Sequence, residues 1–491
     1  MKALQYAPSK KNLTILFLVA LAIRLIVFLG FILKNNYYKQ ADSNDYHYSA
    51  LSLGLGRGMR KLDKSNRPTF WRTPGYPLFL SFFYRIFGIK SLRFEDNWPA
   101  QTAAIIFQII LGSLIPLLIF FLALLLTKSL SIAWLTGYIS AIHLGFVLTD
   151  TYILTESLSI VFLIPFFILF FKSFYLPGEH APDYTKKNKK TKPFWFKQLI
   201  LAAICLAAFA WIRPMGKFVA IASAIIILIL DRVSFTIKLK KIALFLTIFF
   251  LLISPWYIRN YNITGKLFFC PMFGLYLNTF NAPKIIRETE GLDLIKSINK
   301  LYSQAHQKAI LEHRIAKAAG KEVVTELVHL QVALPIIKKH PFLFLKDWTK
   351  EVTKTTLDLY SFQLIDMAKG TCHYDDVEEF LTEKWADCVY KQKAPILTRI
   401  IVYLEIIFEI LKWIGLLLGA FLFLLFPLIK RFKVPEPIKQ NGLLWLKVAP
   451  MIAAFLIMTG GFGYARLRLP VECLMIILSL TFWQYVIEKK K

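Results

Sequence analysis

The residues best suited to chemistry lie in one short segment, residues 41–84, directly after the first hydrophobic stretch. The segment reads ADSNDYHYSALSLGLGRG and, after a polar break, RPTFWRTPGYPLFLSFFY. Asp42 and Asp45 offer carboxylates, which can act as a general base, and Arg67 and Arg72 offer guanidinium groups, which pair bidentately with phosphate. Acids and arginines beside a membrane helix are costly unless they have a partner or a function. The segment therefore predicts a catalytic carboxylate beside a phosphate-binding arginine.

A third acid, Glu156, lies in the motif LTES next to another apolar stretch. The distribution of basic residues places it on the same side of the membrane as Asp42. If these two carboxylates meet, they suit either general-base catalysis or coordination of a divalent metal. Each acid taken alone is equally well explained as a solvated cap at the end of a span.

Four further arginines, Arg213, Arg259, Arg466 and Arg468, fall at span ends on the side that should carry few positive charges. An arginine kept there against this bias calls for an anionic partner, and phosphate fits its planar fork. The alternative for any single one is that it neutralises a nearby acid or extends to the lipid headgroups. As a group, they favour phosphate binding.

The composition is that of an integral membrane protein. The 491 residues are 56% hydrophobic with a mean hydropathy of +0.52, and the apolar residues come in long blocks. The net charge of +29 does not indicate nucleic acid here, because the basic residues flank the apolar blocks and suit anionic headgroups. The first block, Leu13–Leu33, lacks a cleavage site and is interpreted as a retained helix.

The apolar blocks predict an all-α integral membrane protein of about ten transmembrane helices, since a span needs about 20 residues. Two of the blocks are short and could form a tight hairpin at Arg213-Pro214. A further stretch, Ile396–Lys412, is either an interfacial helix or an extra span. The predicted spans are Leu13–Leu33, Trp98–Leu126, Ser131–Leu148, Ile153–Phe171, Gln198–Trp211, Lys217–Leu230, Ile242–Ile258, Trp413–Ile429, Leu443–Met458 and Leu469–Ile487.

Lysine and arginine clusters orient the chain, because they favour cytoplasmic loops. They predict both termini in the cytoplasm and an even number of spans. Residues 1–258 then form an N-terminal transmembrane catalytic module, with an extracytoplasmic loop of juxtamembrane helices at residues 34–97. Residues 259–395 form a mainly helical extracytoplasmic segment, and residues 396–491 form the C-terminal transmembrane helices.

The extracytoplasmic segment has a soluble composition and predicts amphipathic helices at Ser297–Ala318 and Lys321–Lys339. Cys372 and Cys388 lie in this segment, as a disulfide if this face is oxidising or as two free thiols. His47, beside Asp45, is either a base or metal ligand or a surface residue of the loop, and His143 is interpreted as a core residue. The other histidines show no metal-ligand spacing, and the chain has no GxSxG, HExxH or phosphate-binding glycine loop. The phenylalanine-rich spans are typical of lipid-facing helices.

Several segments together resemble the polyprenyl-phosphate-dependent GT-C glycosyltransferases, a family that includes protein O-mannosyltransferases and the aminoarabinose transferase of lipid A. The first is ADSNDYHYSALSLGLGRG with RTPGYPLFL, which resembles the first extracytoplasmic loop of the family. LTES resembles the second acidic motif of the family. The others are WIRP (Trp211–Pro214), SPWYIRNYNITG (Ser254–Gly265) and YARLRLPVE (Tyr464–Glu472).

The resemblance implies a mechanism in which an acid of the first loop deprotonates an acceptor hydroxyl, which displaces the lipid phosphate with inversion. The loop acid of the family matches Asp42, with Asp45 as the second choice, and the second acid matches Glu156. The donor-phosphate contact matches Arg72. Asp42 is followed by Ser43 where mannosyltransferases of the family carry Glu, so a mannosyl donor does not follow.

The remaining site predictions concern binding. Tyr46 and Tyr76 are the candidates for contacts to the sugar or acceptor. Besides Arg72, the donor-phosphate contacts are predicted to include Arg67, Arg259, Arg466 and Arg468. The scheme requires no cofactor, because arginine can neutralise the departing phosphate, although a divalent metal at the acid pair stays open.

The expected partners are a polyprenyl-phosphate sugar, a glycolipid, glycan or protein acceptor, and membrane lipids, but not nucleic acid. The expected location is the bacterial inner membrane, with the active site on the periplasmic face. Two alternative functions are a lipid or polysaccharide transporter or flippase, and a ligase of lipid-linked glycans. A transporter would place acids and breaks in the middle of its spans, whereas here the charges cluster at one interface.

Overall fold

The computed structural model describes residues 8–33, 38–40, 42–62, 66–174, 194–313, 321–361, 396–425, 435–459 and 464–489. In these ranges nearly all regular structure is helical, and the one β-type pairing is an isolated bridge between Arg60 and Pro68. The predicted all-α fold is therefore confirmed. The predicted pair Cys372 and Cys388 lies outside the described residues.

The N-terminal part carries the predicted juxtamembrane helices, α2 and α3, between two apolar stretches. Its elements are α1 (Lys10–Val27) with a π-helical turn (Phe28–Ile32), α2 (Ser43–Gly54), α3 (Gly75–Phe87), a 3-10 turn (Glu95–Asn97), α4 (Trp98–Gly112), α5 (Ile115–Thr127), α6 (Leu130–Ile142), α7 (Leu144–Asp150), α8 (Glu156–Ser173), α9 (Phe194–Ile212), α10 (Gly216–Leu230) and α11 (Phe235–Thr264).

The remaining described residues form a second helical group, α12 to α16, followed by three long apolar helices. The elements are α12 (Met272–Tyr276) with a π-helical turn (Leu277–Asn281), α13 (Ala282–Glu290), α14 (Leu294–His313), α15 (Lys321–Lys339), α16 (Pro341–Leu357), α20 (Ile396–Ala420) with a π-helical turn (Phe421–Leu425), α21 (Glu436–Thr459), a 3-10 turn (Ala465–Leu467) and α22 (Leu469–Lys489). The two amphipathic helices predicted in this segment correspond to α14 and α15.

Eight described helical stretches are long and apolar enough to cross a membrane, and α6 with α7, bent by 49°, could form a ninth. The helix α10 is apolar but shorter. All ten predicted spans thus have a helical counterpart, although the number that cross the membrane stays a prediction. Ile396–Lys412 is not a separate helix, because it forms the first part of α20 and runs on into the span predicted from Trp413.

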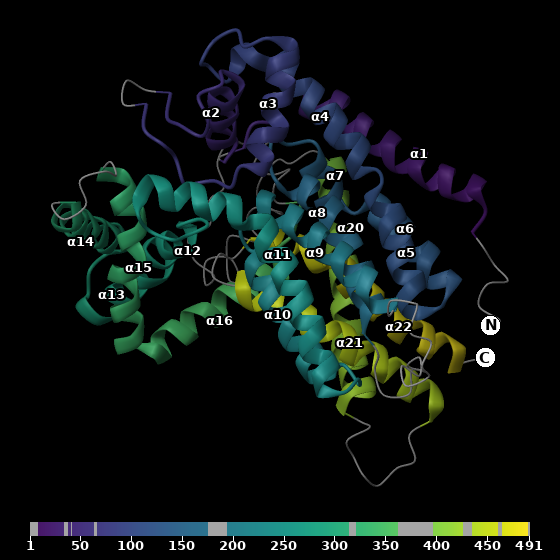
Figure 1. Cartoon of the computed structure of the whole chain (residues 1–491). Coiled ribbons are helices and arrows are strands. Elements are labelled where there is room, and N and C mark those ends of the chain that lie inside the picture. The colour runs from purple at the N-terminus through teal and green to yellow at the C-terminus, as the bar shows by residue number, and fades with distance from the viewer. Residues whose placement is uncertain are drawn as a thin grey trace.

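The helices divide into an elongated apolar bundle and a lateral group (Figure 1). Helices α12 to α16 gather at the left of the view, and α2 and α3 lie at its top. The start of α1 and the end of α22 lie on the opposite side, at the right. The side of the membrane that each of these two ends faces stays a prediction.

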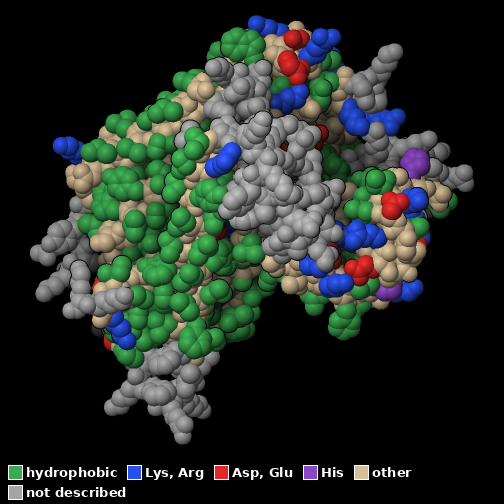
Figure 2. Space-filling model, turned by 180° about the vertical axis from the view of Figure 1, so that it is seen from behind, with side chains coloured by type: hydrophobic (Ala, Val, Ile, Leu, Met, Phe, Trp, Pro, Cys, Tyr) green, Lys and Arg blue, Asp and Glu red, His purple; other side chains and the backbone are tan. Residues whose placement is uncertain are grey.

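Hydrophobic and charged side chains on the surface are also divided between the bundle and the lateral group. Seen from behind, the bundle is covered by hydrophobic side chains over most of its length, whereas lysine, arginine, aspartate and glutamate gather on the lateral helices and on the loops near α2 (Figure 2). A continuous apolar surface of this kind suits a lipid environment.

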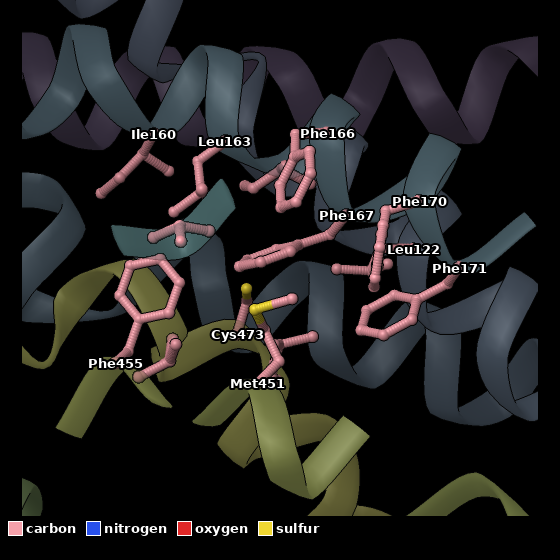
Figure 3. Packing of buried hydrophobic residues seen from close by; sticks show 14 of the residues in the cluster. Leu122, Ile160, Leu163, Phe166, Phe167, Phe170, Phe171, Met451, Phe455 and Cys473 are labelled. Carbon is pink, nitrogen blue, oxygen red and sulfur yellow. The ribbon is translucent and has the colours of Figure 1, made fainter. Parts of the chain in front are cut away.

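The phenylalanine-rich helix α8 corrects the expectation that such spans face lipid. Phe166, Phe167, Phe170 and Phe171 are at most 2% exposed. They pack against Leu122 of α5 and against residues of α21 and α22 in the largest core cluster (Figure 3). Their hydrophobicity is the same in either environment, so the sequence alone does not distinguish an inward-facing from a lipid-facing side.

One buried ion pair in this bundle was not anticipated from the sequence. Arg24 of α1 donates from Nε to Asp150 Oδ2 at 2.5 Å, and both side chains are fully buried. Nη1 of Arg24 also donates to the carbonyl oxygens of Ala20 and Ala141, each at 3.1 Å. A buried charge requires such a partner, so this pair fixes α1 against the end of α7, a few residues before Glu156.

Candidate active site

The loop acids are presented by the start of α2. Asp42 directly precedes this helix, and Asp45 lies in its first turn. Residues three apart share one face of a helix, so both carboxylates point in the same direction. The side chain of Asp42 is 29% exposed and that of Asp45 is 45% exposed, which leaves both acids accessible to a ligand.

Arg72 lies between the two acids. Its Nη2 is 2.8 Å from Asp42 Oδ1 and 2.8 Å from Asp45 Oδ2, and its Nε donates to Asp45 Oδ2 at 3.2 Å. The guanidinium also lies over the ring of Tyr46, with Cζ 4.9 Å from the ring centroid. The predicted base, its predicted alternative and the predicted phosphate contact therefore meet in one cluster.

The turn that carries Arg72 is held by the end of α9. The hydroxyl of Thr73 donates to the carbonyl oxygen of Ile212 at 2.8 Å. Gly75, the first residue of α3, packs directly on the backbone of Trp211: a Cβ atom there would lie 2.6 Å from the carbonyl oxygen. The Pro-Gly turn is thus a point of close contact between the loop and the bundle, for which only glycine is small enough.

We expect Gly75→Ala to disturb the position of Arg72. The added methyl group would overlap the Trp211 backbone, which cannot rotate away as a side chain can, so the free energy of unfolding should fall by about 1–3 kcal/mol. The melting temperature of the purified protein measures this. Gly30→Ala is the matched control, because a Cβ at Gly30 meets nothing within 4 Å. Equal melting temperatures for both variants would contradict the assigned contact.

A second arginine reaches the cluster from the other end of the sequence. Arg466 donates from Nη2 to Asp42 Oδ2 at 2.8 Å, across 424 residues of sequence. Asp42 therefore has one arginine on each carboxylate oxygen. Burial alone would raise the pKa of Asp42, but the guanidinium groups of Arg466 and Arg72 outweigh it and hold that pKa below 3.8.

Glu156, at the start of α8, joins the same group of charges. Its Oε1 is 3.1 Å from Nη1 of Arg213, and its side chain is buried. Although burial lowers the pKa of the Arg466 guanidinium, the carboxylates of Glu156 and Asp42 raise it by a larger amount, so both acids lie near this arginine. Asp42 and Glu156 thus share Arg466 as a neighbouring cation. The site then contains as many acids as arginines, namely Asp42, Asp45 and Glu156 with Arg72, Arg213 and Arg466.

Tyrosine rings line this group of charges. The rings of Tyr46 and Tyr76 meet edge to face with centroids 5.1 Å apart, and the hydroxyl of Tyr76 donates to Gln108 Oε1 at 3.2 Å. Tyr276 of α12 also interacts electrostatically with Arg72, and burial raises the pKa of its hydroxyl to about 12. No motif in the sequence points to Tyr276, and the sequence marks Arg213 only as one of several arginines at the ends of predicted spans.

The other three predicted phosphate contacts are not brought to the acids. Arg67 is exposed, and its guanidinium makes no ion pair with the described residues. Arg259 donates instead to the backbone oxygens of Thr69 and Met59, each at 3.1 Å, and so fastens the loop to α11. Arg468 is fully buried in a separate ion cluster with Glu472 and other groups. Of the predicted set, Arg72 and Arg466 alone contact the loop acids.

The described residues contain one group with metal-ligand spacing, and it is not the acid pair. Ligand atoms of His143, Glu409 and Glu472 lie within 4.8 Å of one another. Lys412 and Arg468 already form ion pairs with both glutamates, so the donor set does not fit a divalent cation. At Asp42 and Glu156, the carboxylates are likewise bonded to guanidinium groups.

A protein-family model described as dolichyl-phosphate-mannose-protein mannosyltransferase matches residues 95–266. The range includes Glu156 and Arg213 but not the loop acids or Arg72. Over this part of the chain, the match confirms the resemblance to the polyprenyl-phosphate-dependent glycosyltransferases that the motifs indicated. No curated protein matches the chain.

Solved structures of two membrane proteins, an oligosaccharyltransferase and ArnT, are similar to the chain. The oligosaccharyltransferase of Archaeoglobus fulgidus, solved with an acceptor peptide, matches with a TM-score of 0.49 and 12% identity over 98% of this chain and 50% of its own. The archaeal oligosaccharyltransferase AglB from Archaeoglobus fulgidus, solved with an inhibitory peptide and a dolichol-phosphate, matches with a TM-score of 0.48 and 12% identity over 98% of this chain and 51% of its own. ArnT from Cupriavidus metallidurans bound to undecaprenyl phosphate matches with a TM-score of 0.38 and 10% identity, over 95% of this chain and 78% of its own. The chain spans about half the length of the oligosaccharyltransferase.

Proposed function

We propose that this protein transfers a sugar from a polyprenyl-phosphate donor to an acceptor hydroxyl at the extracytoplasmic face of a bacterial inner membrane, with inversion. The observation that carries the proposal is the position of Asp42, held between Arg72 and Arg466 and open to a ligand. A carboxylate beside two guanidinium groups combines a base with a phosphate site. The family match over residues 95–266 supports the same class of reaction.

In the proposed reaction, Asp42 takes the proton of the acceptor hydroxyl, and the acceptor oxygen forms a bond to the anomeric carbon. The bond between that carbon and the phosphate oxygen breaks, and the polyprenyl phosphate leaves with the electron pair. Arg72 and Arg466 stabilise the negative charge that develops on the phosphate. The isoprenoid tail stays in the bilayer, which explains why the site lies at the end of membrane helices.

The ion pairs of the free enzyme suggest how donor binding prepares the base. Arg72 and Arg466 pair with Asp42 when no phosphate is bound. A donor phosphate would attract both guanidinium groups, since their forks match its oxygens. Asp42 would then lose the cations that lower its pKa and become a stronger base only when the sugar is in place.

This exchange predicts two different pH profiles. The acid limb of kcat/KM, which reports the free enzyme, should lie below the usual aspartate pKa, because Arg466 and Arg72 hold the pKa of Asp42 below 3.8 against the effect of burial. The acid limb of kcat, which reports the donor complex, should lie at higher pH. Steady-state rates over a range of pH measure both limbs. A kcat limb at or below the kcat/KM limb would contradict the exchange.

The function itself is tested with purified protein in nanodiscs, a panel of polyprenyl-phosphate sugars and a set of glycolipid, glycan and peptide acceptors, with products identified by mass spectrometry. The proposal expects transfer of one sugar and release of polyprenyl phosphate. Movement of an intact glycolipid between leaflets without any transfer would instead favour a flippase. Use of diphosphate-linked but not monophosphate-linked sugars would favour a ligase.

A further inference from the structure

The turn that carries Arg466 is also held by hydrogen bonds of its backbone. Residues 465–467 form a 3-10 turn, in which the Leu467 N–H donates to the Tyr464 carbonyl oxygen at 3.0 Å. The backbone N–H of Ala465 donates to Asp358 Oδ2 at 2.7 Å. Asp358 directly follows α16, so the neighbour of Arg466 is bonded to the end of the second helical group.

The side chain of Arg468 forms a second link from this turn to α16. Its Nη1 donates to the carbonyl oxygens of Thr355 and Asp358, both at 3.0 Å, and of Thr356 at 2.7 Å. The last carbonyl groups of a helix have no partner within the helix and carry partial negative charge. Arg468 therefore caps the C-terminus of α16, two residues beyond the arginine that contacts Asp42.

The rest of the Arg468 guanidinium is held by acids of two apolar helices. Its Nε donates to Glu472 Oε2 at 2.7 Å and its Nη2 to Glu409 Oε1 at 2.9 Å. Lys412 forms ion pairs with the same two glutamates, at 2.7 Å for Glu409. Two cations and two carboxylates balance, as a buried group of charges requires. The turn is thus anchored to α20 and α22 as well as to α16.

Ion pairs also fix the body of α16 within its own helical group. Lys284 of α13 lies 3.0 Å from Asp347 of α16 and also pairs with Glu351 one turn further on. Ion pairs therefore join α13 to α16, and hydrogen bonds join the end of α16 to Ala465 and Arg468. Through the helix α16, these contacts connect α13 to the turn that places Arg466 against Asp42.

We infer that Asp358 and Arg468 are positioning residues, which hold Arg466 at Asp42 and couple the second helical group to the donor site. This inference rests on the proposed function for the role of Arg466, but the placement of the turn does not depend on it. It also gives Arg468 a role different from the direct phosphate contact expected from its sequence position. Displacement of α16, by an acceptor or otherwise, would then move Arg466.

The test is a double-mutant cycle between Asp358→Ala and Arg466→Gln, with binding of undecaprenyl phosphate and the KM for the lipid-phosphate sugar as readouts. Asp358→Ala alone should weaken lipid-phosphate binding about tenfold, whereas in the Arg466→Gln background it should have little further effect. Additive losses in the two backgrounds would overturn the inference, because an indirect loss of stability acts whether or not Arg466 is present.

Two further variants separate positioning from folding. Asp358→Asn should keep near-normal binding, because its amide oxygen can still accept the Ala465 N–H. Burial disfavours the charged form of Asp358 and raises its pKa to about 6, so a neutral side chain also avoids this cost. Glu351→Gln breaks an anchor elsewhere on α16 and should affect lipid-phosphate binding less than Asp358→Ala does. A stronger effect of Glu351→Gln would contradict the assigned path.

Amide hydrogen exchange of residues 464–468 provides a readout that does not depend on the reaction. Asp358→Ala should speed exchange in this turn, whereas Asp358→Asn should not. Unchanged exchange would overturn the inference even if the protein proves to bind no lipid phosphate. Conversely, faster exchange in a protein that neither binds undecaprenyl phosphate nor transfers sugar would sustain the placement of the turn and reject the proposed function.

Discussion

Replacement of Asp42 by Asn is expected to lower kcat for sugar transfer by roughly 10²- to 10⁴-fold, the usual contribution of a general base. Asn keeps the shape of the side chain but cannot accept the proton of the acceptor hydroxyl. Binding of the donor should be unchanged or tighter, because Arg72 and Arg466 no longer pair with a competing carboxylate. Single-turnover transfer and equilibrium binding of undecaprenyl phosphate separate the two effects.

Asp45→Asn is the matched control for this experiment. Asp45 lies on the same face of α2 and shares Arg72, but it makes no ion pair with Arg466 among the described residues, and its side chain is more exposed. We expect a much smaller loss of kcat than for Asp42→Asn. The reverse order of effects would transfer the role of base to Asp45, and full transfer activity in both variants would remove the loop acids from the chemistry.

Replacement of Arg72 by Ala should have the second large effect, a fall in kcat/KM for the donor of roughly 10²- to 10³-fold. Arg72 is buried and pairs with both loop acids, so its loss removes one side of the proposed phosphate site and leaves the two carboxylates without the cation that they share. Both changes oppose binding of an anion. Donor KM and the affinity for undecaprenyl phosphate measure this effect.

Two variants sharpen the interpretation of Arg72→Ala. Arg72→Lys keeps the charge but loses the planar fork, so it should recover only part of the affinity. Arg67→Ala should change donor binding little, because Arg67 is exposed and the described ion pairs of the loop acids are with Arg72 and Arg466 instead. If Arg67→Ala weakened the donor as much as Arg72→Ala, the phosphate site would extend along the loop, and the assignment to Arg72 would need revision.

Features that depend on local composition could be predicted from this sequence. Blocks of apolar residues predicted ten helical elements, because crossing a bilayer imposes both length and hydrophobicity. Motifs within one loop predicted that Asp42, Asp45 and Arg72 belong together, and the structure brings these three side chains into contact. Their predicted roles in the reaction are tested by the variants of Asp42, Asp45 and Arg72 described above.

Features that depend on distant contacts could not be predicted in the same way. Arg466 and Asp42 are 424 positions apart in the sequence. Arg468 is an arginine only two residues from Arg466, but it pairs with Glu472 in the bundle and not with the loop acids. A turn between them directs one side chain to the acids and the other into the bundle. The pairing of Arg24 with Asp150 and the inward direction of the α8 phenylalanines depend in the same way on packing between helices.

The equal numbers of acids and arginines in the candidate site have a consequence for selectivity. Soluble anions such as phosphate or sulfate must compete with Asp42, Asp45 and Glu156, which already occupy the guanidinium groups. A lipid-linked phosphate is confined to the membrane surface and reaches the site at a high effective concentration. Arginines that are already paired with acids would therefore bind dissolved anions weakly but would still bind a lipid-linked phosphate. The lipid anchor is then part of what the site recognises.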